Sequence, residues 1–271
     1  MTEIIFIILF TIAVSYFTIH FTVINIFSII PMDRNKPKKI VIFDLDETLG
    51  TFLEIGIFWS AIQRFFGKQN NESFYEVLDI FPEFLRPNII NILFLLLEEK
   101  RKGTCHKVII YTNNQGPKSW ARLIADYFEH KLGDKIFDQI INAYKVNDIQ
   151  VEKNRTSHVK SLSDFFACTN EDKNCEICFI DDQFHKGMKG PNALYINVMP
   201  YKYYLSYHLM AERYYDFYEP LIEKNIFLNA ILSITNRHNT RGYEKSQEDY
   251  NLDEVISKKI YFHLTNFLNK K

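Results

Sequence analysis

From about residue 38 onward, short apolar runs alternate with longer segments of mixed polarity. Four of these runs are rich in β-branched residues and predict buried strands at 40–43, 107–111, 177–180 and 193–198. A weaker run at 137–144 is a further strand candidate. Because helical segments separate the strands, the pattern predicts an α/β fold with parallel pairing through right-handed crossovers.

The segments between the strands place apolar residues at helical spacing. The predicted helices cover 58–84 with a break near 67–71, then 87–100, 118–128 and 159–166. Residues 201–271 are mostly helical in pattern, with a polar break at 236–251 that we expect to be a surface loop. We therefore divide the chain into an N-terminal segment (1–37), an α/β domain (38–200) and a mostly helical C-terminal extension (201–271).

The N-terminal segment is a candidate membrane anchor. Residues 4–30 are almost wholly apolar and contain no Asp, Glu, Lys or Arg, and the run exceeds the roughly 20 residues that span a bilayer. Basic residues follow it and only Glu3 precedes it, which would place the rest of the chain in the cytosol. Two alternatives remain: a buried helix of a soluble fold, or translation from Met32, which would give a cytoplasmic or nuclear protein.

Composition and charge exclude several classes of protein. A chain that is 47% hydrophobic can bury a core, so it is not disordered. The net charge of −1 gives no basic field, which makes nucleic acid the less expected partner. The four cysteines form no disulfide framework, and Cys175 and Cys178 make a lone pair at metal-ligand spacing, so we expect ordinary thiols.

Polar side chains follow the ends of three predicted strands. Asp44 and Asp46 follow the first, Thr112 the second, and Asp181 and Asp182 the third. Ligands of open α/β sheets bind beyond these carboxyl ends, so the side chains should converge. Carboxylates gathered in one place stay ionised together only around a cation, and their hard oxygens favour Mg²⁺.

The spacing of Asp44 and Asp46 suits two-step chemistry. Alternate residues beyond a strand end can face one substrate, so that one carboxylate attacks and the other moves protons. The hydroxyl of Thr48 and the turn at 49–50 can hold the loop in shape. The alternative is a pair of acidic turn residues that only cap a strand.

Four ordered motifs give the chain a family resemblance. They are the segments FDLDETL at 43–49, VIIYT at 108–112, HVKSL at 158–162 and FIDD at 179–182, and the segment LRP at 85–87 adds a fifth similarity. Together they resemble haloacid dehalogenase-like phosphatases, nearest the branch of RNA polymerase C-terminal-domain phosphatases and NLI-interacting-factor-like proteins. The resemblance implies a Rossmann-like fold with a central parallel sheet and a small cap or none.

The resemblance also implies an aspartyl-phosphate mechanism dependent on Mg²⁺. Asp44 would attack phosphorus, and Asp46 would protonate the leaving oxygen and then activate water. The remaining expected roles are phosphate binding by Thr112, Asn113 and Lys160, metal binding by Asp44, Asp46 (through its backbone carbonyl), Asp181 and Asp182, and support of the loop by Thr48. In that branch the position of Asp182 is often Asn, so which of the two last aspartates touches the metal stays open.

Two assignments have close competitors. Lys153 and Arg155 lie near Lys160, which we prefer because it starts a short amphipathic segment in register with the lysine motif. After Thr112 the chain departs from its nearest branch and is similar instead to polynucleotide 3′-phosphatases and histidinol phosphatases. There Asn113 and Gln115 either donate hydrogen bonds at the mouth of the site or, as we favour, shape the turn.

The expected substrate follows from the spacing of the motifs. Only 63 residues separate Thr48 from Thr112 and 47 separate Thr112 from Lys160, which leaves no room for a large cap. An open site suits a phosphorylated macromolecule, and we expect phosphoprotein substrates modified on Ser or Thr. The alternatives are a polynucleotide-end or small-molecule phosphatase, or a non-catalytic module similar to the mitochondrial presequence receptor. Retention of both Asp44 and Asp46 favours an enzyme.

Overall fold

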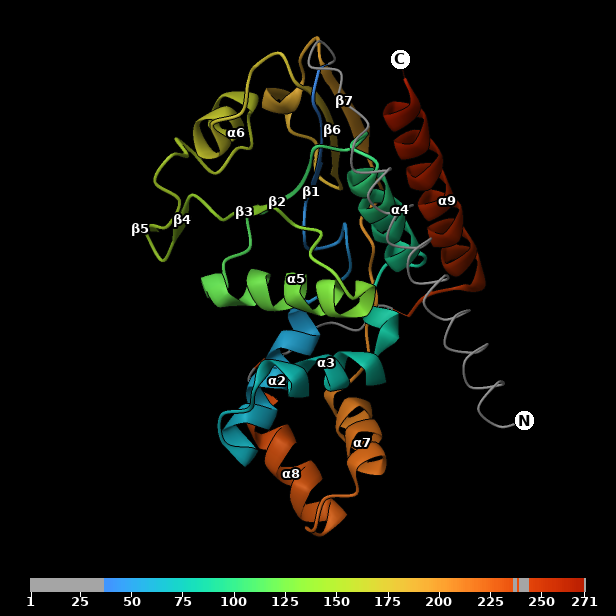
Figure 1. Cartoon of the computed structure of the whole chain (residues 1–271). Coiled ribbons are helices and arrows are strands. Elements are labelled where there is room, and N and C mark those ends of the chain that lie inside the picture. Colours follow the sequence, from blue (N-terminus) through green and yellow to red (C-terminus); the bar gives the residue numbers. More distant parts are fainter. Residues whose placement is uncertain (1–36, 236–237, 239–243, 271) are drawn as a thin grey trace, which may run out of the picture. The chain divides into compact units, whose positions relative to one another are not determined.

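A parallel β-sheet forms the centre of the structure, which is a computed structural model (Figure 1). In the described part of the chain the sheet has five strands in the order β3-β2-β1-β6-β7. Their bounds are Lys39–Phe43 (β1), Lys107–Tyr111 (β2), Gln139–Ile141 (β3), Glu176–Asp181 (β6) and Ala193–Asn197 (β7). Every neighbouring pair is parallel, which confirms the predicted α/β fold of Rossmann type.

Helices cover both faces of this sheet because its central strands are apolar on both sides. Val41 and Phe43 of β1 pack with α4 (Ile89–Arg101), α5 (Lys118–Leu132) and α9 (Gln247–Asn269). The alternate residues Ile40 and Ile42 pack with α6 (Leu162–Thr169). Because alternate residues of a strand point to opposite faces, helices pack on both sides of the sheet and the structure has three layers. Helices α4 and α9 lie side by side on the first face (Figure 1).

Four further helices form a module next to the sheet (Figure 1). They are α2 (Leu53–Phe66), α3 (Asn71–Ile80), α7 (Tyr207–Tyr218) and α8 (Lys224–Thr235). Phe58 of α2 joins the two halves, because its ring meets Phe81 and Tyr214 edge-on at 5.7 and 5.9 Å. We expected a small cap or none because only the residues between the motifs were counted. Two of the four helices, α7 and α8, come from beyond residue 200 and were outside that count.

Several helix boundaries differ from the predicted ones. The helix expected from Pro87 begins at Ile89 as α4, and α6 begins at Leu162, so Lys160 lies in the preceding loop. Helix α9 begins inside the predicted polar break, because Ser246 and Asp249 form a capping box at its N-terminus. Short 3₁₀ turns occupy Pro82–Phe84 (η1) and Lys186–Met188 (η2).

A small hairpin was not predicted. Strands β4 (Lys145–Val146) and β5 (Ile149–Gln150) pair antiparallel through a two-residue turn. Asn147 and Asp148 both have positive φ, at 49° and 61°, which two-residue hairpin turns require and which these residue types tolerate. The two strands are too short to carry an alternating pattern.

The structure describes residues 37–235, 238 and 244–270, and the chain from residue 37 onward forms one compact unit. The apolar segment 4–30 and Met32, on which the membrane prediction depends, lie outside these residues. No helix within the described ranges is both long and apolar enough to cross a membrane.

Candidate active site

The carboxyl edge of the sheet brings Asp44 and Asp181 together around one buried ammonium group. Asp44 follows β1, and Asp181 ends the neighbouring strand β6. The Nζ of Lys160 hydrogen-bonds to Asp44 Oδ1 and, at 2.7 Å, to Asp181 Oδ2. The rings of Tyr111 and Phe179 flank this Nζ at 5.7 Å each, and the lysine side chain is only 2% exposed. The site therefore holds one desolvated cation between two carboxylates.

This geometry distinguishes the candidate lysine-motif residues. Lys160 contacts Asp44, whereas Lys153 is exposed and Arg155 is buried in a different role. Because Lys160 lies in the loop before α6, the amphipathic segment that we expected it to start begins two residues later. The loop that carries Lys160 is tied to α6 at Thr156, whose backbone N–H and hydroxyl both donate to the carboxylate of Asp164.

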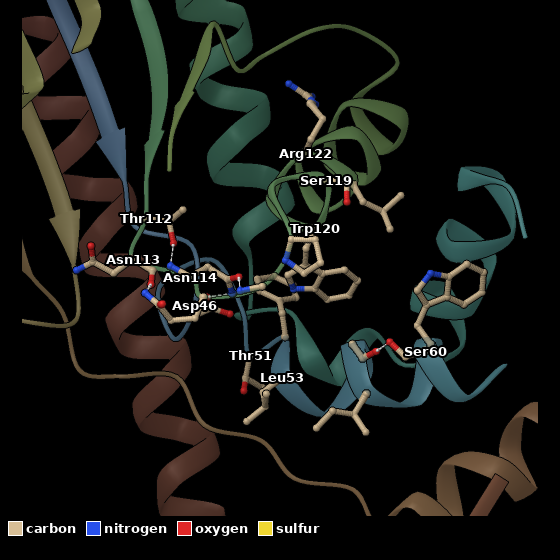
Figure 2. Close-up of a pocket in the computed structure, with 18 of the residues that line it drawn as sticks. Asp46, Thr51, Leu53, Ser60, Thr112, Asn113, Asn114, Ser119, Trp120 and Arg122 are labelled. Carbon is tan, nitrogen blue, oxygen red and sulfur yellow. Dashed lines mark hydrogen bonds between the residues drawn. The ribbon is translucent and has the colours of Figure 1, made fainter. Parts of the chain in front are cut away.

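Asp46 faces a different partner. Asn114 Nδ2 donates to Asp46 Oδ2 at 2.6 Å (Figure 2). The orientation of this amide is fixed, since its Oδ1 accepts the backbone N–H of Gly116 at 2.8 Å. Burial raises the pKa of Asp46 to about 6, and the hydrogen bond from Asn114 opposes that rise. Asp46 can therefore hold or release a proton near neutral pH, as an acid–base group must.

The loop that carries both aspartates is held by its own backbone and by Thr48. The hydroxyl of Thr48 donates to Asp182 Oδ1 at 3.0 Å and accepts the backbone N–H of Asp182 at 3.1 Å. Glu47 has a φ of 61°, and its N–H bonds to the carbonyl of Gly50. A Cβ at Gly50 would lie 2.5 Å from the carbonyl oxygen of Phe84, so only glycine permits this approach. Thr48 thus joins this loop to Asp182, the residue that follows β6.

Arg86 fixes the same loop from outside. Its Nε donates to the carbonyl of Thr48 at 2.6 Å, and its Nη2 donates to those of Glu47 and Met199 at 2.7 and 2.9 Å. The guanidinium is 1% exposed and lies against the ring of Tyr201, and its burial lowers its pKa to about 10. The segment LRP at 85–87 had been noted only as a family similarity, and the structure gives its arginine a physical role.

Thr112 ends β2 and faces the cleft. Its Oγ1 accepts the backbone N–H of Asn114 at 3.0 Å, and among the described residues its hydroxyl hydrogen has no acceptor. The side chain of Asn113 is held at both ends, because Oδ1 accepts from Arg155 at 2.8 Å and Nδ2 donates to the carbonyl of His158 at 3.0 Å. One of its two amide N–H donors is thus already engaged away from a phosphate, which leaves the backbone N–H as the candidate donor for the predicted contact. Gln115 Nε2 also donates to the carbonyl of Asn113. These bonds within the loop favour the interpretation that Asn113 and Gln115 shape the turn.

Arg155 joins the two loops that carry Thr112 and Lys160. Its Nη1 donates to the carbonyls of Thr112 and Asn142, and its Nη2 donates to the carbonyl of His158. The guanidinium also lies over the ring of Tyr111, 4.8 Å from the ring centre. A fully buried arginine with these partners positions the site without contacting Asp44. Sequence reasoning weighed it only as a rival to Lys160.

Three carboxylates form a cluster of the size that a divalent cation needs. One oxygen from each of Asp44, Asp181 and Asp182 lies within 4.8 Å of the other two. Opposite ligands of an octahedral Mg²⁺ are about 4 Å apart, so three carboxylates this close together could hold such an ion. Burial and the charge of Asp44 raise the pKa of Asp182 to about 6. Burial also raises the pKa of Asp181 to about 7, against the attraction of Lys160.

His185 is a neighbour of the cluster that the motifs did not indicate. Its Nε2 lies 3.6 Å from Asp181 Oδ2. Burial, together with the charges of Lys160 and Arg155, lowers the pKa of His185 to about 4, so the imidazole is neutral at pH 7. Lys160 therefore supplies the positive charge next to Asp181, and His185 contributes shape.

A cleft of about 1250 Å³ opens from this cluster. Its inner end contains Asp44, Asp46, Thr112, Lys160, Asp181 and Asp182, so the structure brings together the site residues expected from the sequence. Figure 2 shows the indole of Trp120 between the Asp46–Asn114 pair and helix α2. Comparison with protein-family models, with curated proteins and with solved structures finds no match. Any function must therefore be argued from this geometry.

Proposed function

We propose that this protein is a Mg²⁺-dependent phosphatase that forms an aspartyl phosphate on Asp44, with a haloacid dehalogenase-like fold. The observation that carries the proposal is the convergence of Asp44, Asp46, Thr112 and Lys160 at the carboxyl edge of a parallel sheet. These residues come from three of the motifs that resemble that family. Such a group matches the parts that phosphoryl transfer needs, namely positioning and charge neutralisation.

The first half-reaction is assigned to the two aspartates. A carboxylate oxygen of Asp44 forms a bond to phosphorus while the bond from phosphorus to the leaving oxygen breaks. Asp46, whose raised pKa keeps a proton available near pH 6, donates that proton to the leaving oxygen. In the second half-reaction Asp46 takes a proton from water, whose oxygen bonds to phosphorus and releases Asp44 with inorganic phosphate.

The surrounding groups bind and orient the phosphoryl group. Lys160 holds Asp44 by its Nζ and offers a buried positive charge to the phosphate oxygens. The Thr112 hydroxyl and the Asn113 backbone N–H are the candidate neutral donors. Asp44, Asp181 and Asp182 would hold Mg²⁺, which when bound neutralises charge on the phosphoryl oxygens. Phosphoproteins remain the proposed substrates, and residues 4–30 the proposed anchor, with the cytosol as the proposed location of the site.

The test is hydrolysis of p-nitrophenyl phosphate by the full chain, purified in mild detergent, with Mg²⁺ or with EDTA. Asp44→Asn should abolish Mg²⁺-dependent turnover while the circular dichroism spectrum stays that of the folded protein. Asp148→Asn is the matched control, because it makes the same chemical change at an exposed turn where Asn tolerates the positive φ. A folded wild-type protein without Mg²⁺-dependent activity would support the non-catalytic binding module instead.

A further inference from the structure

The cleft extends well beyond the acidic cluster. One wall is helix α2, and the other is the 113–117 loop with the first turns of α5 (Figure 2). Its volume of about 1250 Å³ exceeds the roughly 300–1000 Å³ of typical small-molecule pockets. A phosphorylated metabolite at the acidic end would leave most of this cleft unfilled, so the shape favours a longer substrate.

The length of the cleft can be taken from helix α2. Both Leu53, at the first position of the helix, and Arg64, near its end, line the cleft. Eleven positions at 1.5 Å each place them about 16 Å apart along the helix axis. An extended peptide advances roughly 3.3 Å per residue, so about five residues reach from one end to the other.

The walls between these ends combine apolar side chains with uncharged polar ones. Ser60 and Gln63 of α2 line the cleft, as do Gln115 and Ser119 of the 113–117 loop and α5, and all four can donate or accept hydrogen bonds. Trp120 adds an apolar surface close to the acidic end. The groups along the cleft thus match the alternating donors, acceptors and side chains of a peptide.

Helix α2 and Trp120 approach closely only because residue 56 is glycine. A Cβ at Gly56 would lie 2.9 Å from Cζ2 of the indole. Beside it Leu53 is 62% exposed and lines the same stretch of cleft. An apolar contact surface therefore lies directly next to the residues that would hold the phosphoryl group.

The far end of the cleft has a positive charge. Arg64 and Lys68 are exposed, and neither forms an ion pair with any acidic side chain that the structure describes. On the opposite wall Arg122 is neutralised by Asp126 and Glu129, at 2.7 and 2.6 Å. Arg64 and Lys68 are thus the charges available to an anionic group bound there.

The distribution of these charges distinguishes a peptide from a nucleic acid. A single strand carries a phosphate at every nucleotide, so the grooves that bind one have cations along their length. Here the unpaired cations are confined to the far end, and Glu47 and Asp126 also line the cleft. An anionic side chain on an otherwise neutral peptide fits this pattern better.

We propose that this cleft selects phosphopeptides with an acidic side chain about five residues from the phosphorylated one, bound by Arg64 and Lys68. The proposal rests on the proposed phosphatase function. It assigns the inner end of the cleft to the phosphoryl group, the Trp120 surface to an adjacent side chain, and the outer end to a carboxylate.

The experiment compares kcat/KM of the full chain for about eleven-residue phosphoserine peptides that carry two Glu, two Ala or two Lys about five positions before or after the phosphoserine. Rates are divided by the p-nitrophenyl phosphate rate of the same protein. We expect Glu in one direction to raise this ratio about fivefold over Ala at low salt, because exposed ion pairs contribute modestly and are screened. The double variant Arg64→Glu/Lys68→Glu should lose that preference and favour the Lys peptide.

The double variant Lys258→Glu/Lys259→Glu is the matched control, since both lysines are exposed on α9 outside the cleft. It should keep the preference for Glu. The inference would be overturned if the normalised kcat/KM values of Glu and Ala peptides were equal both before and after the phosphoserine. If p-nitrophenyl phosphate were still hydrolysed in that case, the proposed function would stand. A 3′-phosphorylated oligonucleotide that exceeds every peptide would also overturn it. Absence of Mg²⁺-dependent hydrolysis would instead count against the phosphatase itself.

Discussion

Magnesium should stabilise this protein much more at about pH 7.5 than at about pH 5.5. The reason is that Mg²⁺ binds ionised carboxylates, whereas burial raises the pKa of Asp181 to about 7 and that of Asp182 to about 6. At the lower pH both groups are largely protonated, and the ion must displace those protons. At the higher pH both are largely ionised and available.

The size of the effect follows from the two pKa values. At about pH 5.5 proton competition weakens Mg²⁺ binding roughly 30-fold at Asp181 and roughly 4-fold at Asp182, or about 100-fold together. A 100-fold change in affinity corresponds to about 2.7 kcal/mol. A domain of this size gains about 2–4 °C in Tm per kcal/mol. Mg²⁺ at about 100 times its Kd at the higher pH should therefore raise Tm by about 5–10 °C there and about 1 °C at the lower pH.

Without magnesium, the raised pKa of Asp181 determines how the free energy of unfolding changes with pH. The folded pKa of Asp181 lies above the unfolded value of 3.8, so between about pH 4 and 7 the folded chain retains a proton that the unfolded chain has lost. The free energy of unfolding should thus fall as pH rises through this range. Added Mg²⁺ should reverse that fall at its upper end.

The assay is differential scanning calorimetry of the full chain with Mg²⁺ or EDTA at both pH values. Asp181→Asn should remove the Mg²⁺-dependent rise in Tm at pH 7.5, and Asp148→Asn, an exposed substitution of the same type, should retain it. An equal rise at both pH values, or a full rise in Asp181→Asn, would refute the assignment of the ion to this cluster.

Three further predictions test other parts of the site. Arg155→Met should cost about 3–5 kcal/mol in urea unfolding, because it removes the donor from the carbonyls of Thr112 and Asn142 and from the side-chain oxygen of Asn113; a loss under 1 kcal/mol would contradict its positioning role. Gly56→Ala should lower Tm despite its higher helix propensity, because its Cβ would meet Trp120 at 2.9 Å, and Trp120→Phe should restore part of the loss. At saturating Mg²⁺, hydrolysis of an alkyl phosphate should slow as pH rises above about 6, where Asp46 loses its proton, and Asp46→Asn should abolish this dependence in a pH-rate profile.

The sheet and its polar edge could be predicted because their signals are local. The runs at 40–43 and 108–111 are both rich in β-branched residues, apolar and shorter than a helix, and a residue with a polar side chain follows each of them. Parallel pairing then places those ends at one edge without further information. The prediction that Asp44, Thr112 and Asp181 converge needed only this rule, and the structure confirms it.

The residues that hold the site could not be found in this way. Arg155 was considered only as an alternative to Lys160, the preferred lysine-motif residue, and only the fold shows that its guanidinium reaches the carbonyl of Thr112, 43 positions away. Asn114 was not among the predicted site residues, because its contact with Asp46 joins residues 68 positions apart. The four-helix module was missed for the same reason, since α2 and α8 come from opposite halves of the chain.

Two buried arginines explain how the loops of the site keep their shape. Arg86 binds the backbone carbonyls of the loop after β1, and Arg155 binds those of the loops after β2 and before α6. A backbone carbonyl accepts a hydrogen bond whatever side chain its residue has. These carbonyl contacts place no demand on the side chains of Thr48 and Thr112, so both hydroxyls stay available for the roles described above. Asn113 differs, because Arg155 also binds its side-chain oxygen, and this residue therefore holds the loop through its side chain as well.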